Sequence, residues 1–248
     1  MKKKYILRLK DIENISTENP NYSIIIKEVL GFNNFPIGRK HIFAKKFKEA
    51  HLLITEARKI DPTKVLCPEE SDIKKPKNID NISFRAMMEL RSSLGGYNGE
   101  TDFSLFVSKI IAIATYQENF KEDYNSNCKK FNDFQNLILK NHIWKMIGIY
   151  NWIDKAIKES DLEWSKRFMS VEVLDPDYEL AGGGRMGQFN VVTTIKNICS
   201  DFNCNYDEAW QMSYVLTQTN SYAKATQNHI QDQMRQLKEI RMKSKSKN

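Results

Sequence analysis

Apolar residues recur every three or four positions through most of the chain, and this spacing predicts a mainly helical protein. The repeat is clearest in residues 38–60, where charged residues fill the other faces. The apolar positions there follow 4-3-4-3 steps: Phe43, Phe47, Ala50, Ile54 and Ala57. Asp61 and Pro62 end the segment, because proline cannot continue a helix. We expect this stripe to be a packing face.

Further helices are expected in the middle of the chain. Residues 84–94 predict one that ends at Gly95 and Gly96, and residues 128–158 predict a long one with bulky aromatic anchors. Between them, Thr101 can cap a helix that is apolar on most of its circumference. Such a helix belongs in the centre of a bundle. Two shorter helices are expected, at 22–30 and 189–202.

The C-terminal part predicts one long, mostly polar helix. Asn205 is followed three residues later by Glu208, the arrangement in which each residue caps the other's free N–H group at a helix start. From there to Arg241 the sequence contains neither proline nor glycine. Apolar residues of its second half form a narrow stripe, suited to contact with one neighbouring helix: Ile230, Met234, Leu237 and Ile240.

Three segments depart from the helical pattern. Apolar and polar residues alternate in 4–10 and 171–174, which predicts short strands. Residues 61–83 hold three of the six prolines without periodicity, and this length exceeds an ordinary connection, so we expect a linker or an arm that wraps a partner. The expected fold is mainly α: a multi-helix bundle with a few short strands, a proline-rich arm and a long C-terminal helix.

This reading divides the chain into five parts. They are an N-terminal basic strand and helices (1–60), an extended arm or linker (61–83), a helical core (84–174), a glycine-rich loop (175–188) and a C-terminal helical module with a basic tail (189–248). At 248 residues, with 41% hydrophobic and 28% charged residues, the chain is long and apolar enough to bury a core.

Positive charge is concentrated at the two ends. Residues 1–10 carry five cations and no acid, and residues 235–248 carry six cations and one acid, so of the net +7 the residues between keep −3. A DNA-reading domain usually gathers its cations on one face of the fold. The ends are therefore either solvated tails or contacts to phosphates or an acidic partner. The candidate contacts are Lys2, Lys3, Lys4, Lys243, Lys245 and Lys247.

Neither export nor metal binding is expected. The first ten residues lack the apolar run of a secretory signal, and no stretch approaches the length of a membrane span, so we expect an intracellular origin without membrane contact. Four scattered cysteines are expected to be reduced thiols. Cys199 and Cys204 lack a second ligand pair for zinc, and both read as small apolar residues near a helix end.

The run Gly182, Gly183, Gly184, Arg185 and Gly187 resembles a phosphate-binding loop only superficially. The spacing formally satisfies G-x-G-x-x-G, but no βαβ unit surrounds it and the Walker signature is absent. Three readings stay open: an exposed flexible loop, a loop that inserts into a neighbouring subunit, and a nucleotide site. We place Gly182, Gly183, Gly184 and Arg185 among the candidate interface residues, together with the C-terminal stripe.

No catalytic set emerges from the sequence. The signatures H-E-x-x-H and G-x-S-x-G are absent, and four histidines are widely separated. Asp175, Asp177 and Glu179 cluster on a loop but do not follow the twelve-residue calcium pattern. We therefore expect no enzyme activity, no cofactor and no metal site.

The block 188–239 resembles the small helical modules in tail and head-to-tail connector proteins of tailed bacteriophages. A short helix, a turn at 201–205 and a helix start at 206–212 carry the resemblance, which covers about a fifth of the chain. The composition, rich in Lys, Asn and Ile, resembles proteins of phages that infect Bacteroidetes, including the crAss-like group.

The resemblance implies a virion structural protein, assembled in the host cytoplasm into an oligomeric ring around a DNA channel. Its neighbours would be further copies and other virion proteins such as portal or tail components, with non-specific DNA contact through the basic ends. The alternative is a phage or bacterial nucleic-acid-associated accessory protein that uses the basic termini. A helical enzyme with unannounced catalytic residues is a third class.

Overall fold

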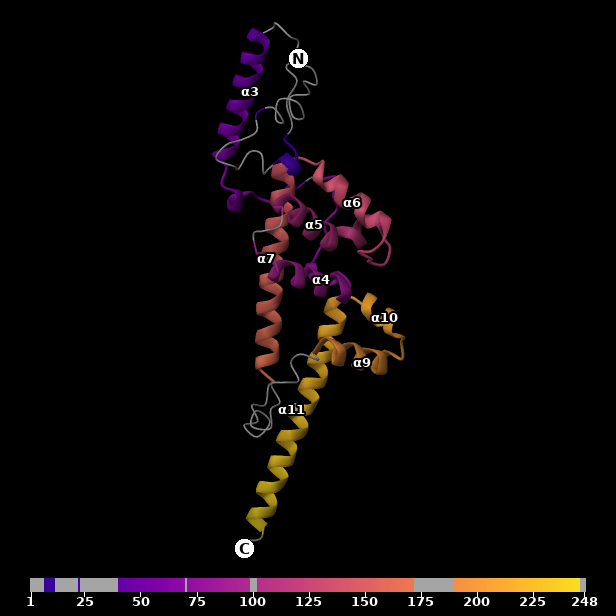
Figure 1. Cartoon of the computed structure of the whole chain (residues 1–248). Helices are drawn as coiled ribbons and strands as arrows, with labels where there is room; N and C mark the ends of the chain where they lie inside the picture. Colours follow the sequence, from indigo (N-terminus) through magenta and orange to yellow (C-terminus); the bar gives the residue numbers. More distant parts are fainter. Residues whose placement is uncertain are drawn as a thin grey trace. The chain divides into compact units, whose positions relative to one another are not determined.

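The computed structural model describes residues 7–11, 22, 40–69, 71–98, 102–171 and 190–245. Over these ranges the protein is mainly helical, as expected, with eight α-helices and no strand (Figure 1). The chain divides into two compact units: Met1–Lys77 with Met88–Lys155 form unit 1, and Asn78–Met87 with Ala156–Asn248 form unit 2. A search of the described helices for a membrane-spanning segment finds none.

Unit 1 is built around α5 (Phe103–Phe120), the helix expected at a bundle centre. Most of its side chains are buried, because apolar residues occupy nearly every face. Its N-cap is Asp102, whose carboxylate accepts a hydrogen bond from the Leu105 backbone N–H at 3.1 Å. The expected cap Thr101 is therefore wrong as the N-cap, and it lies outside the described residues. α6 (Lys129–Leu139) packs along α5 through aromatic rings, with Phe120 and Phe134 centred 5.0 Å apart.

The expected single helix over 128–158 is wrong, because the chain breaks at 140–142 between α6 and α7 (Ile143–Met169). The Leu9 N–H donates to the Asn141 carbonyl at 3.0 Å, and the Ile143 N–H donates to the Leu7 carbonyl at 2.9 Å. Backbone groups that a continuous helix would use internally are thus paired with a segment far away in the sequence. Sequence periodicity does not carry this information.

The same contact corrects the strand expected at 4–10. Its described part has one isolated antiparallel bridge, Arg8 with His142, followed by the short 3₁₀ helix η1 (Leu9–Asp11). Leu9 is fully buried. Of the other expected strand, 171–174, only Val171 is described, and it lies in a turn. Neither position supports a strand within the described chain.

The helix expected at 38–60 is confirmed as α3 (Lys40–Arg58), after which the proline-rich segment packs on its own unit. The short helix η3 (Pro62–Lys64) begins this segment, and the Asn151 side chain of α7 donates to the Pro62 and Val65 carbonyls at 2.8 and 3.0 Å. Farther on, the Asn119 side chain of α5 accepts from the Lys74 N–H and donates to the Lys74 carbonyl. Side-chain amides therefore replace the regular backbone partners that this segment lacks.

Unit 2 contains η4 (Ile79–Asn81), the first turn of α4 (Phe84–Gly95), and the helices near the C-terminus. α9 (Asn190–Phe202) matches the helix expected at 189–202. Asn205 and Glu208 form the expected reciprocal cap, with both hydrogen bonds at 2.9 Å. They cap α10 (Tyr206–Gln211), a short helix that is separate from α11 (Tyr214–Lys245).

The expectation of one uninterrupted helix from Asn205 to Arg241 is therefore wrong. The Phe84 N–H donates to the Met212 carbonyl at 2.7 Å, and the Tyr214 N–H donates to the Ile82 carbonyl at 2.8 Å. These bonds form the isolated bridge between Ser83 and Ser213. As in unit 1, a long-range bridge occupies backbone groups at the point where two helices meet.

Replacement of Gly148 by alanine should destabilise unit 1. A Cβ at this position of α7 would lie 2.2 Å from the Leu66 carbonyl oxygen and 2.9 Å from its carbon, so the backbone of 66–67 would have to move. We expect a loss of about 2 kcal/mol in the free energy of unfolding, measured by urea denaturation followed by circular dichroism. Gly95→Ala is the matched control, because its Cβ meets nothing within 4 Å. Equal stability of the two variants would contradict the close packing of this segment on α7.

Candidate interaction surface

The first half of α11 is fixed within unit 2. Tyr214 and Thr217 are buried, and Tyr214 stacks near Phe84 with ring centroids 6.2 Å apart. Asp201 of α9 accepts from the Asn220 side chain and pairs with Lys224, each at 2.6 Å. The contact with Lys224, together with that amide, lowers the pKa of Asp201. This end of the helix is therefore held by apolar, polar and ionic contacts.

The second half of α11 is largely exposed and carries the predicted apolar stripe (Figure 1). The exposed fractions of the four side chains are 51% for Ile230, 51% for Met234, 54% for Leu237 and 63% for Ile240. Ile230, Met234 and Leu237 lie within roughly 60° of one another around the axis, since each residue advances a helix by about 100°. The helix thus presents a narrow apolar face rather than burying it in unit 2.

Charges are unevenly distributed around this half of the helix. Arg241 lies roughly 15° from the centre of the stripe and Lys238 roughly 75° from it. Both acids of α11, Asp232 and Glu239, lie roughly 170° away on the opposite face. Asp232 is 3.4 Å from Arg235, also away from the stripe. The sequence would have revealed this segregation if charged positions had been counted by angle together with the apolar ones.

The remaining predicted contact residues are only partly placed. The structure brings four stripe residues together on one helix and extends α11 through Lys243 and Lys245. Gly182, Gly183, Gly184, Arg185, Lys2, Lys3, Lys4 and Lys247 lie outside the described residues. Their predicted roles remain predictions.

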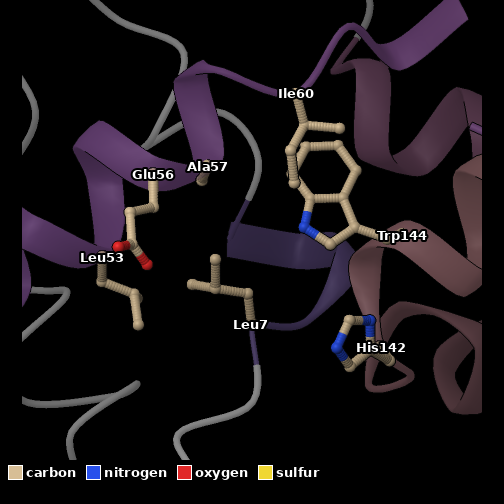
Figure 2. A pocket seen from close by; sticks show the side chains of 7 residues that line it. All are labelled: Leu7, Leu53, Glu56, Ala57, Ile60, His142 and Trp144. Atoms are coloured by element: carbon tan, nitrogen blue, oxygen red, sulfur yellow. The ribbon is translucent and has the colours of Figure 1, made fainter. Parts of the chain in front are cut away.

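A pocket of about 190 Å³ lies in unit 1 between α3 and the start of α7 (Figure 2). Glu56 and Leu53 come from α3 on one side, Trp144 and His142 come from the other, and Leu7 lies between them. Its volume is below the roughly 300 to 1,000 Å³ of typical small-molecule sites. Among the residues that the structure places, no three His, Cys, Asp or Glu side chains are grouped to hold a metal ion.

One thiol has an environment that the sequence did not indicate. Cys128 is the N-cap of α6, and its Sγ accepts from the Phe131 N–H at 3.3 Å. The Tyr116 hydroxyl of α5 lies 3.5 Å from the same sulfur, and this hydrogen bond lowers the pKa of Cys128. Burial raises the pKa of Cys204 instead. The pairing depends on how α5 and α6 pack, so spacing along the chain gave no sign of it.

Comparisons with protein-family models, with curated proteins and with solved structures find no match to this chain. The surface must therefore be interpreted from its own geometry.

Cys128 should react with iodoacetamide at lower pH than Cys204, because the thiolate is the reactive form and Tyr116 stabilises it at Cys128. Tyr116→Phe removes the hydrogen bond and keeps the ring, so the alkylation midpoint of Cys128 should move to higher pH. The measurement is peptide mapping by mass spectrometry across a pH series. Cys204 is the internal control and should not shift. An unchanged Cys128 midpoint in the variant would mean that the hydroxyl does not act on the thiol.

Proposed function

We propose that this protein is a non-enzymatic structural subunit of an oligomeric assembly, and that the stripe of α11 is one of its contact surfaces. The observation that supports the proposal is the exposure of four apolar side chains, 51% to 63%, along one helix whose other end is anchored in unit 2. Scattered apolar residues are normal on a surface, whereas an aligned row suggests an interaction site. A helix of this kind suits contact with one neighbouring helix.

The specific assembly that we propose is a ring in a phage tail or head-to-tail connector, built in the host cytoplasm and carried in the virion. Support comes from the resemblance of residues 188–239 to helical modules of such proteins. A ring subunit presents two different surfaces to its neighbours. The stripe would supply one of them. Gly182, Gly183, Gly184 and Arg185 would supply a loop that inserts into a neighbouring copy or into a portal or tail component.

The basic ends are proposed to face DNA or the next component of the particle. α11 keeps its helical course through Lys243 and Lys245, which extends positive charge along the same element as the stripe. This charge also favours the alternative, a nucleic-acid-associated accessory protein. The two functions differ in oligomeric state, which makes that state the first quantity to measure.

Leu237→Asp should reduce the oligomeric mass of the purified protein in sedimentation equilibrium. Burial of a leucine side chain contributes about 2 kcal/mol, so each lost contact should weaken association roughly 30-fold. Met242→Asp is the matched control, since Met242 is 64% exposed on the same helix and lies roughly 110° from the stripe centre. Circular dichroism should show equal helix content in both variants.

A wild-type chain that stays monomeric at high concentration and binds duplex DNA tightly would contradict the ring proposal. If deletion of residues 235–248 then abolished DNA binding, the accessory-protein alternative would replace it. An equal effect of Leu237→Asp and Met242→Asp would mean that the stripe is not the contact surface.

A further inference from the structure

The stripe of α11 carries positive charge and no acid. Lys238 flanks it and Arg241 continues its row, while Asp232 and Glu239 occupy the far side of the helix. Earlier in α11 there is no acid at all, because Asp232 and Glu239 are the only carboxylates between Tyr214 and Lys245. Any surface that covers the stripe therefore meets apolar side chains bordered by cations.

A second α11 is a poor partner for this face. In a parallel pair, Arg241 would lie beside its own copy. In an antiparallel pair, the cations would lie against the acid-free stretch that precedes Asp232. Neither arrangement supplies a carboxylate to Lys238 or Arg241. Like charges across a helix pair destabilise it and select other partners.

Nucleic acid and membrane also fit this face less well than a helix does. Phosphate contacts require cations but make no use of exposed Ile230, Met234 and Leu237. Helices that lie on a membrane have wide apolar faces that often carry Trp or Phe. Residues 227–245 contain no Phe, Trp or Tyr, and the stripe is narrow. Its width matches the seam of a two-helix contact.

We infer that the second half of α11 docks on an acidic amphipathic helix of a different surface, either on another protein or elsewhere on a neighbouring copy. The apolar residues of that helix would pack on Ile230, Met234 and Leu237, and its Asp or Glu residues would flank the seam opposite Lys238 and Arg241. This inference rests on the proposed assembly role, because it names the partner of the same surface.

The test uses the full chain and two synthetic probe peptides of about four heptads, with Ile at position a and Leu at position d. One peptide has Glu at positions e and g, and the other has Lys there. Like charges keep each peptide from pairing with itself. Fluorescence anisotropy should give at least tenfold tighter binding of the acidic peptide. Equal binding of the two peptides would overturn the inference.

Charge reversal provides the decisive variant. Lys238→Glu with Arg241→Glu should reverse the preference toward the basic peptide. Lys145→Glu with Lys196→Glu makes the same change in net charge at exposed positions on α7 and α9, and should keep the acidic preference. A preference that the first pair leaves unchanged would place the contact elsewhere. Because all four positions are exposed, the fold should tolerate both pairs, which circular dichroism checks.

Apolar variants separate a helix partner from a polyanion. Met234→Ser with Leu237→Ser should weaken binding of the acidic peptide about tenfold, whereas Met242→Ser should not. Duplex DNA and vesicles containing phosphatidylserine serve as the other probes. Either one binding more tightly than the acidic peptide, with the same sensitivity to Lys238→Glu and Arg241→Glu, would overturn the inference.

Sedimentation of these variants distinguishes failure of this inference from failure of the proposed function. If Leu237→Asp dissociates an oligomer that the reversal of Lys238 and Arg241 leaves intact, the assembly role holds and the acidic partner is wrong. If the peptide preference holds while the chain alone remains monomeric, the partner chemistry holds and self-assembly is wrong.

Discussion

Each unit depends on one antiparallel backbone bridge between segments that are far apart in sequence. In unit 1 the bridge joins Arg8 to His142, and in unit 2 it joins Ser83 to Ser213. A helix break leaves N–H and C=O groups without their regular partners, and burial of such groups is costly unless they are paired elsewhere. The bridges supply that pairing. They fix where α6 gives way to α7 and α10 to α11, and so they fix the direction in which each later helix starts.

The bridge of unit 2 links fold to surface. It sets the start of α11, after which Tyr214 and Thr217 are buried and Asp201 holds Asn220 and Lys224. Only beyond these contacts does the helix become largely exposed. The stripe therefore belongs to a helix whose base is held, and little ordering of α11 would be needed when a partner binds. A preorganised surface of this kind loses less entropy on association than a flexible tail does.

Sequence periodicity was sufficient to predict most helices and the stripe, because both depend on local spacing. α3, α4, α5 and α9 lie close to their expected positions, and the capping pair of Asn205 and Glu208 is present. The two helix breaks were missed since their cause is a partner strand segment more than one hundred residues away. The Cys128 and Tyr116 contact was missed for the same reason, as it exists only when α5 and α6 pack together.

Packing of the proline-bearing segment through Asn119 and Asn151 has a consequence for its tolerance of substitution. The two amides bind main-chain carbonyls and an N–H group, which every residue except proline offers in the same form. Exposed positions between Pro62 and Lys74 are therefore free to vary in side chain without loss of these hydrogen bonds. The requirement falls on α5 and α7 instead, where a carboxylate in place of either amide would set oxygen against oxygen.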